Sequence, residues 1–385
     1  MYQKTTICLL GGGQLGRMLL QAGVDLNIEF RVLDHNANAP CASFTNQFVC
    51  GSLTDFETVY QFGKNAEIIT IEIENVNTNA LRCLEQEGVR VFPQPHLIEL
   101  IQDKRLQKQF YEQNHFPTAP FVLTEKKEDL KNYPDFFPAV HKCGKGGYDG
   151  KGVRILETFE DWCKGFELPS VLEKKISIYK EISVIVARNS NGEIKAFPVV
   201  ECAYHPTQNL VDFLIMPAEI ANKLEKRAQE IAIELIQKLE LVGILAVEMF
   251  IDTQENIFIN EVAPRPHNSG HQTIEGNFTS QYAQHLRAIL NLPLGNPQLR
   301  APSAMINLLG EPSHEGEAAY IGLEKVLQLD QTYVHLYGKH QTKPYRKMGH
   351  ITVLGTNRQQ LLEKIHFIKG LIKVVSAPNR QVINP

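Results

Sequence analysis

A glycine turn between an apolar strand and an apolar helix, "CLLGGGQLGRML" at residues 8–19, constrains the fold more than any other stretch. Its Gly11-x-Gly13-x-x-Gly16 spacing lets backbone N–H groups approach an anion at the start of a helix. A second apolar run, 29–33, ends at Asp34. Strand, glycine turn, helix and an acidic strand end are typical of a dinucleotide-binding unit. The spacing alone leaves open whether the turn holds NAD or another phosphate, or only packs helix on strand.

Short apolar runs and helical stretches alternate through residues 1–100. The expected strands are 5–10, 29–33, 46–50, 67–73 and 89–92. Such alternation favours a doubly wound parallel sheet with helices on both faces.

The rest of the chain divides into three further regions. We expect a linker helix over 97–113, most of which falls in region 101–180, and a small α+β module in the rest of that region. Region 181–300 reads as a central sheet with helices at 218–240 and 279–290, and 301–385 as a compact C-terminal domain with a helix at 357–369. The expected class is thus multidomain α/β and α+β.

Composition excludes several classes of protein. The 385 residues carry a formal net charge of −4, which argues against nucleic-acid binding. No apolar run approaches the length of a membrane span, and the N-terminus lacks the pattern of a signal peptide. The seven cysteines show no C-x-x-C spacing, which favours free thiols in a reducing compartment. We expect a cytoplasmic protein without a membrane partner.

A second glycine-rich loop, "GKGGYDGKG" at 144–152, has five glycines in nine residues. Its small side chains and many N–H groups suit a cover over a polyphosphate, although the tip of a flexible hairpin is the alternative. Lys142 stands just before the loop, where its charge can neutralise phosphate.

Two carboxylates interrupt apolar strands further on. Glu248 lies in "GILAVEMFI", and Asn260 and Glu261 end the run in "IFINEVAPR". If the strands pair antiparallel, Glu248 and Glu261 meet, and two carboxylates with bound phosphates make a typical Mg²⁺ site. The alternative is the solvent face of an edge strand.

Taken in order, these features resemble the ATP-grasp superfamily. "GGGQLGRML", "GGYDGKG", "NEVAPRPHNSGH" and "SQYAQHLRAILNLPL" are similar to one of its families, the 5-(carboxyamino)imidazole ribonucleotide synthases of purine biosynthesis. The resemblance implies an ATP-grasp fold behind an N-terminal doubly wound domain, with the small C-terminal domain packed on the central one, and a homodimer. Chain positions that depart from the family pattern include Val153 and Gln272.

The resemblance also implies an ATP site under the second glycine loop. Lys104 and Lys142 would contact phosphates, Glu181 the ribose, and Glu248 and Glu261 would hold Mg²⁺. The further ATP contacts would be Gly147, Tyr148, Asp149, Gly150, Lys151, Gly152, Val153, Glu173, Lys174, Lys175, Ile176, His205, Asn260 and Glu261. Tyr204 is an alternative to His205.

The implied activity is ATP-dependent carboxylation of 5-aminoimidazole ribonucleotide with bicarbonate, through carboxyphosphate, giving the 5-carboxyamino product, ADP and phosphate. Arg265, Tyr148 and Asp149 would face the reacting groups. The implied ribonucleotide contacts are Gln14, Leu15, Glu74 (or Glu72 instead), Arg265, His267, Asn268, Lys339 and Arg346. His267 and His271 are four residues apart, but Pro266 and "NSG" indicate a substrate loop rather than a metal pair.

Three other readings explain less. Another ATP-grasp ligase would have no use for "PHNSGH" or the Lys339 and Arg346 pair. An NAD-dependent dehydrogenase would leave the second glycine loop idle, and a non-catalytic nucleotide-binding module would not need both carboxylates. The resemblance implies that the first glycine turn borders the ribonucleotide.

Overall fold

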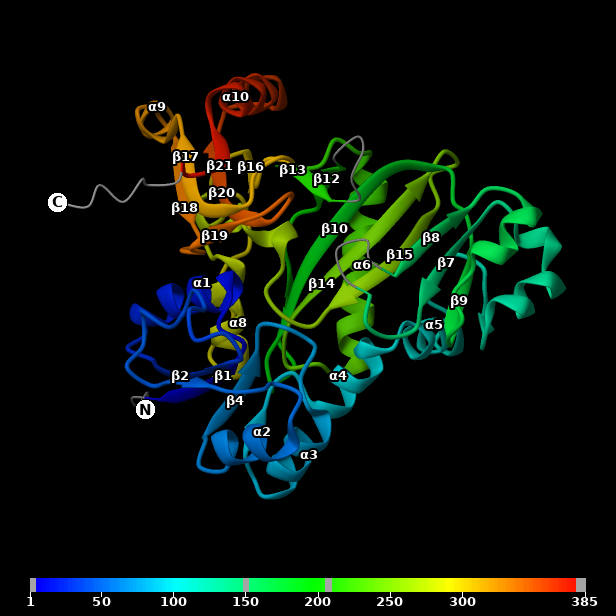
Figure 1. Cartoon of the computed structure of the whole chain (residues 1–385), viewed down its shortest axis with the longest axis horizontal. Helices are drawn as coiled ribbons and strands as arrows, with labels where there is room; N and C mark the ends of the chain where they lie inside the picture. The colour runs from blue at the N-terminus through cyan, green and yellow to red at the C-terminus, as the bar shows by residue number, and fades with distance from the viewer. Residues whose placement is uncertain (1–4, 148–151, 205–209, 379–385) are drawn as a thin grey trace.

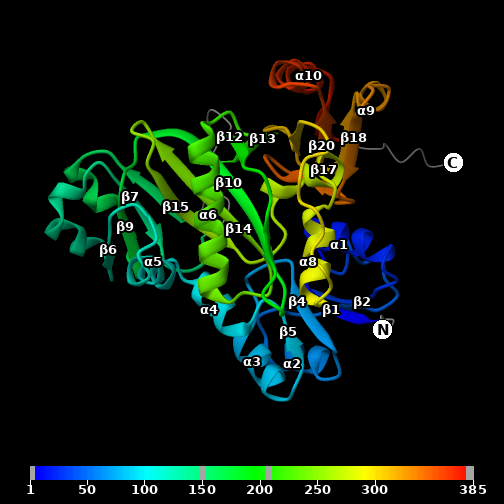
Figure 2. The same cartoon turned by 180° about the vertical axis from the view of Figure 1, so that it is seen from behind.

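A computed structural model describes residues 5–147, 152–204 and 210–378 (Figures 1 and 2). In this part of the chain the strands form four sheets. Within the described residues, no helix is both long and apolar enough to cross a membrane.

The N-terminal region contains the predicted doubly wound parallel sheet, in the order β3-β2-β1-β4-β5. Its central strands are buried on both faces, as continuous Val, Ile and Leu runs require. The elements are β1 (Thr6–Leu10), α1 (Gln14–Val24), β2 (Glu29–Asp34), β3 (Phe48–Cys50), α2 (Phe56–Gly63), β4 (Ile68–Ile71), α3 (Thr78–Gln86) and β5 (Arg90–Val91).

The prediction of a single helix over 97–113 is wrong. Two helices occupy the segment, α4 (Pro95–Gln102) and α5 (Lys104–Gln113). Asp103 between them is extended, with φ −120° and ψ 109°, and its carboxylate accepts the Arg105 N–H at 3.0 Å. An aspartate that caps the second helix ends the first, although the apolar pattern continues.

A small antiparallel sheet, in the order β6-β9-β7-β8, lies to the right in Figure 1. Its strands are β6 (Phe121–Thr124), β7 (Ala139–Cys143), β8 (Val153–Leu156) and β9 (Ser170–Lys174). Strands β7 and β8 flank the second glycine loop.

The central sheet has nine strands, in the order β15-β14-β10-β12-β13-β16-β20-β18, with β11 beside β10. The predicted antiparallel pair is confirmed as β14 and β15. Strands β16, β20 and β18 come from beyond residue 301, so the C-terminal region extends this sheet. The strands are β10 (Ile178–Arg188), β11 (Ile194–Ala196), β12 (Val200–Tyr204), β13 (Val211–Met216), β14 (Gly243–Asp252), β15 (Ile257–Ala263), β16 (Ser303–Leu309), β18 (Thr332–Leu336) and β20 (Lys347–Leu354).

Two helices anchor this sheet. Helix α6 (Asn222–Leu239) covers β10 and β14 (Figure 2), and its Ile231 and Leu235 share one core with Val184 and Val247. It begins four residues later than the predicted 218. Helix α8 (Gln281–Ile289) packs between α1 and β14, so it joins the N-terminal domain to the central sheet.

The C-terminal region adds a three-stranded sheet, in the order β19-β17-β21, and two helices. These elements are β17 (Gly316–Ile321), α9 (Leu323–Leu327), β19 (Gln341–Thr342), α10 (Arg358–Leu371) and β21 (Lys373–Ser376). Apolar residues of α10 share a core with β16 and β20.

Candidate active site

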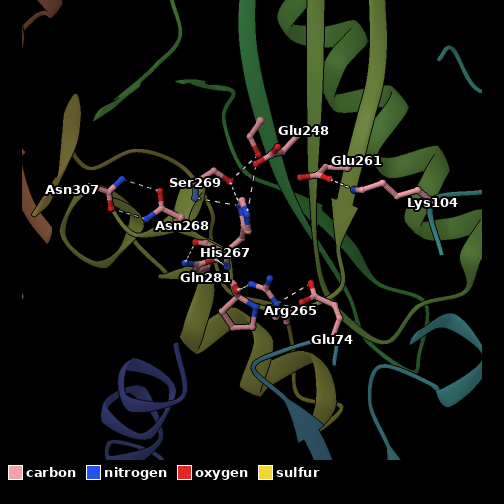
Figure 3. A network of polar contacts seen from close by, with 12 residues as sticks. Glu74, Lys104, Glu248, Glu261, Arg265, His267, Asn268, Ser269, Gln281 and Asn307 are labelled. Carbon is pink, nitrogen blue, oxygen red and sulfur yellow. Dashed lines mark hydrogen bonds and ion pairs between the residues drawn. The ribbon is translucent and has the colours of Figure 1, made fainter. Parts of the chain in front are cut away.

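The two predicted carboxylates lie side by side on neighbouring strands. Glu248 of β14 and Glu261 of β15 are paired residues in the antiparallel register, just before an irregularity. Figure 3 shows both side chains directed toward the loop that follows β15, with Lys104 reaching Glu261 from α5.

The pKa values of the two glutamates are shifted in opposite directions. Burial, then the charges of Glu261 and Glu181, raises the pKa of Glu248 to about 8. The ammonium of Lys104 is the largest influence on Glu261 and lowers its pKa to about 2. The two carboxylates are therefore shifted in opposite directions, and a bound cation would favour the ionised form of Glu248.

Lys142 at the end of β7 reaches the same place. Its Nζ lies 2.8 Å from Asn260 Oδ1 and 3.0 Å from Glu173 Oε2. Lys108, which the sequence reasoning missed, contacts the other oxygen of Glu173 at 3.2 Å. A signal was present, because Lys108 follows Lys104 by four residues and so shares its face of α5.

Glu173, predicted at the adenine edge, is buried with its carboxylate between these two lysines. Burial alone would raise its pKa, but Lys142 and Lys108 outweigh it and lower the pKa. Lys174 ends β9, Lys175 pairs with Glu157 at 2.7 Å, and Ile176 lies in the connection to β10.

Glu181 on β10 lies on the Glu248 side of the group. Burial raises its pKa to about 7, against the lowering effects of a Tyr204 hydrogen bond and the charge of Lys142. Tyr204, the alternative to His205, thus contacts a predicted ATP residue. His205 is outside the described residues.

The two ends of the second glycine loop lie close together. Gly152 has φ +81°, and a Cβ there would lie 3.1 Å from the Gly147 Cα. Val153 begins β8 beside them. The loop's remaining predicted residues, Tyr148, Asp149, Gly150 and Lys151, lie outside the described residues.

The loop after β15 borders the carboxylates from below in Figure 3. Arg265 Nε lies 2.9 Å from Glu74 Oε1, which links this loop to the N-terminal domain. His267 Nε2 is 3.6 Å from Glu248 Oε1. Gln281 holds the backbone of His267, accepting its N–H at 2.9 Å and donating to its carbonyl at 2.7 Å.

The next residues of that loop face elsewhere. Asn268 exchanges hydrogen bonds of 2.9 and 3.2 Å with Asn307 of β16, a partner no sequence signal indicated. His271 is buried, 3.0 Å from the Tyr282 hydroxyl. His267 and His271 therefore occupy different surroundings.

The first glycine turn is filled by the protein's own carboxylates. Glu72 accepts the N–H groups of Gly13 and Gly16 at 2.5 and 2.7 Å, and Asp34 accepts that of Gly12 at 2.7 Å. These donors are therefore not available to the pyrophosphate of NAD. Glu72 and Glu74 have separate positions, one in the turn and one against Arg265.

The remaining residues predicted for the ribonucleotide lie at the start of α1 and beside β19. Gln14 and Leu15 begin α1, Leu15 being buried. Lys339 and Arg346 flank β19 and donate to backbone carbonyls, Lys339 to Lys347 at 2.7 Å and Arg346 to Gln341 at 2.6 Å. The charge of Lys347, which the sequence reasoning also missed, acts on Glu248, where it opposes the rise in pKa that burial causes, and on His271, where it adds to the lowering of the pKa by burial.

Metal-binding capacity rests on the carboxylate pair. Among the described residues, no three His, Cys, Asp or Glu side chains converge as a protein-only metal site would need. Two glutamates suit Mg²⁺ only if phosphate oxygens and water complete its shell, as is usual for this ion.

Three family models cover most of the chain. A ribonucleotide synthetase preATP-grasp domain matches residues 4–102, and an ATP-grasp domain matches residues 109–282. A phosphoribosylaminoimidazole carboxylase C-terminal domain matches residues 303–364.

Full-length relatives agree with these models. N5-carboxyaminoimidazole ribonucleotide synthase of Bacillus subtilis is 34% identical over 371 residues, covering 94% of this chain and 95% of that protein. Phosphoribosylaminoimidazole carboxylase of Candida glabrata is 36% identical over 382 residues, which are 95% of this chain and 66% of that protein. The chain thus spans about two thirds of the Candida protein.

Solved structures show the same architecture. N5-carboxyaminoimidazole ribonucleotide synthetase from Thermotoga maritima superposes with a TM-score of 0.90 at 40% identity, over 97% of this chain and 100% of that one. The Aspergillus clavatus N5-carboxyaminoimidazole synthase, crystallised with ADP and 5-aminoimidazole ribonucleotide, gives 0.88 at 30% identity, over 96% and 99% of the two chains.

Proposed function

This chain belongs to the N5-carboxyaminoimidazole ribonucleotide synthase family of ATP-grasp ligases, and we propose on that premise how its residues perform the family's reaction. It carboxylates the amine of 5-aminoimidazole ribonucleotide at the expense of ATP, a step of purine biosynthesis. Bicarbonate is the carboxyl source, activated as carboxyphosphate.

The ATP phosphates lie among Lys104, Lys142 and the loop 147–152. Phosphoryl transfer mainly requires positioning and neutralisation of charge, and two ammonium groups with loop amides supply both. Glu181 takes the ribose, and the connection 174–176 borders the base. Glu173 contributes through Lys142, because its carboxylate is buried against that lysine.

Glu248 and Glu261 fit Mg²⁺, with Asn260 beside them. The ion would neutralise phosphate charge during transfer. The raised pKa of Glu248 supports this assignment, since desolvation and the charge of Glu261 disfavour its ionised form and a bound cation would offset both.

The acceptor side is the loop after β15 and the N-terminal domain. Arg265, suited to clamp a planar oxyanion, is oriented by Glu74 at 2.9 Å, and His267 faces Glu248. The ribonucleotide lies between Asn268 and the start of α1 at Gln14 and Leu15. Its phosphate is held from the C-terminal region by Lys339 and Arg346. The four regions predicted from the sequence are the domains that we propose for the protein.

One observation carries the proposal: Lys104 from α5 and the loop with Arg265 and His267 meet at a single pair of glutamates (Figure 3), and Lys142 from β7 reaches the neighbouring Asn260. The deciding assay measures ADP formation by the purified enzyme. ADP should require bicarbonate and rise strongly with aminoimidazole ribonucleotide. Equal ADP formation without the ribonucleotide would overturn the assignment.

Glu261→Gln tests the metal carboxylate. The change keeps the size of the side chain but removes the charge that Lys104 and the cation require, so kcat should fall about a hundredfold or more. Glu255→Gln, an exposed change in the same hairpin, is the control and should leave the rate unaltered. Near-normal turnover of Glu261→Gln, with Mg²⁺ dependence unchanged, would exclude it as a ligand.

The proposal includes a cytoplasmic homodimer. All seven cysteines are free, as in a reducing compartment, and the dimer is what the family resemblance implies. Light scattering of the purified protein should give twice the chain mass, and the mass of one chain would contradict the dimer.

A further inference from the structure

Lys108 is a buried cation that the proposed reaction does not use. Its side chain is 3% exposed, and its ammonium lies 3.2 Å from Glu173 Oε1 and 2.6 Å from Thr118 Oγ1. Burying an ammonium is costly unless a partner compensates it. The burial of the Lys108 ammonium therefore requires a role that a solvent-exposed lysine would not have.

Glu173 is shared between two lysines. Its other oxygen lies 3.0 Å from Lys142 Nζ, and the carboxylate is 5% exposed. The buried group thus contains two positive charges and one negative charge, a sum of +1. Without Lys108, Glu173 would neutralise Lys142 entirely, and the sum would be zero.

We propose that Lys108 is a positioning residue for ATP: it neutralises Glu173 so that the group of Lys142, Glu173 and Lys108 keeps a net positive charge for phosphate. The inference rests on the proposed function and extends it to a residue that need not touch the nucleotide. Glu173 then orients Lys142, and Lys108 keeps the net charge of the group positive.

The groups around Lys108 agree with this role. From α5, Lys104 faces it, and from β7 so does Lys142, while the ring of Phe121 on β6 lies 5.8 Å away. Glu173 on β9 is the carboxylate in contact with it. Burial and the two lysines lower the pKa of Lys108 to about 8, and Glu173 opposes the shift.

A charge-compensation cycle separates this role from simple packing. The variants are Lys108→Gln, Lys108→Met, Lys108→Arg, Glu173→Gln, and the double change of Lys108→Gln with Glu173→Gln. ADP binding is measured by calorimetry in magnesium buffer without ribonucleotide or bicarbonate. The control is Lys195→Gln, which changes a lysine of β11 that pairs with Glu193.

Loss of the charge should weaken ADP binding about tenfold in Lys108→Gln or Lys108→Met, with KM for ATP raised and KM for the ribonucleotide unchanged. Lys108→Arg should stay within about threefold of wild type, since it keeps the charge. The double variant restores the sum of +1 and should bind ADP more tightly than Lys108→Gln.

Additive losses in the double variant would overturn the inference, because it requires that removing Glu173 together with Lys108 restores the net charge that is lost when Lys108 alone is removed. So would neutral variants that bind ADP normally. If one neutral variant does not fold, the other supplies the comparison, and Lys108→Arg shows whether charge or shape matters. Failure of the proposed function would instead show in wild type, as ADP formation that ignores the ribonucleotide.

Discussion

Glu72 explains why the first glycine motif predicts a turn correctly and a ligand wrongly. Its two carboxylate oxygens take the N–H groups that a phosphate would otherwise take, at Gly13 and Gly16. The side chain is 8% exposed, and a Cβ on Gly13 would lie 2.5 Å from its Oε1. Gly13 is thus required by an internal carboxylate that follows β4, and the protein satisfies its own anion site.

At the residue scale we predict that Glu72→Ala destabilises the N-terminal domain. Two buried donors lose their acceptor, each worth about 1–3 kcal/mol, so the free energy of unfolding should fall by about 2 kcal/mol or more. Glu72→Gln keeps one acceptor oxygen and should lose less. Urea unfolding followed by circular dichroism measures both.

The control for this comparison is Glu67→Gln, an exposed glutamate just before the same strand. It should leave the urea midpoint in place. Equal midpoints for Glu72→Ala and Glu67→Gln would show that the turn does not depend on the carboxylate.

Among the elements, the break between α4 and α5 has a consequence for the site. Because α5 starts anew at Lys104, its first residue projects to Glu261 while Lys108, one turn on, reaches Glu173. The Lys104 N–H also donates to the Gly144 carbonyl at 2.8 Å, beside the base of the second glycine loop. A continuous helix would have placed these lysines elsewhere.

Asp103→Ala should therefore weaken both the fold and nucleotide binding. Loss of the cap costs about 1 kcal/mol, and a frayed start of α5 releases Lys104, so KM for ATP should rise. Asp103→Asn retains the oxygen that accepts the Arg105 N–H and should lie close to wild type. Equal kinetics and thermal midpoints for the Ala and Asn variants would contradict a capping role.

Sequence reasoning predicted the elements whose partners are near in the chain. The hairpin brings Glu248 and Glu261 into register across a four-residue turn, so alternation alone could place them together. The break between α4 and α5 at Asp103 is not predicted, because the apolar spacing continues through it and only a capping side chain marks it. Glu72 and Asn307 find their partners 56 and 39 residues away, which no local pattern encodes.

Across the whole molecule, α8 connects the N-terminal domain to the central sheet. Its Tyr282, Leu286 and Ile289 share a core with α1 and β1. His285 on the same helix is fully buried, with Nε2 2.9 Å from the hydroxyl of Thr70 on β4. Burial lowers the pKa of His285 to about 3.

We predict that this buried histidine makes the junction between the domains sensitive to acid. The folded-state pKa lies below the ordinary value near 6.5, so the folded state binds fewer protons than the unfolded chain at intermediate pH. The stabilisation is therefore complete above about pH 6.5 and is lost as the pH falls from there toward 3, by about 1.4 kcal/mol per pH unit. Other buried histidines, His141, His271 and His350, have pKa values lowered by burial and act in the same direction.

His285→Gln removes one such proton from the unfolding reaction. The variant should be less stable than wild type at pH 7, and the difference in free energy of unfolding should narrow by about 1 kcal/mol per pH unit between pH 6 and 5. Urea unfolding at half-unit pH steps measures this, with His96→Gln, an exposed position, as the matched control. Because carboxylate titrations are common to all three proteins, they cancel in the difference. A gap between wild type and His285→Gln that stays constant from pH 7 to 5 would mean that His285 is not the group that makes this junction sensitive to acid.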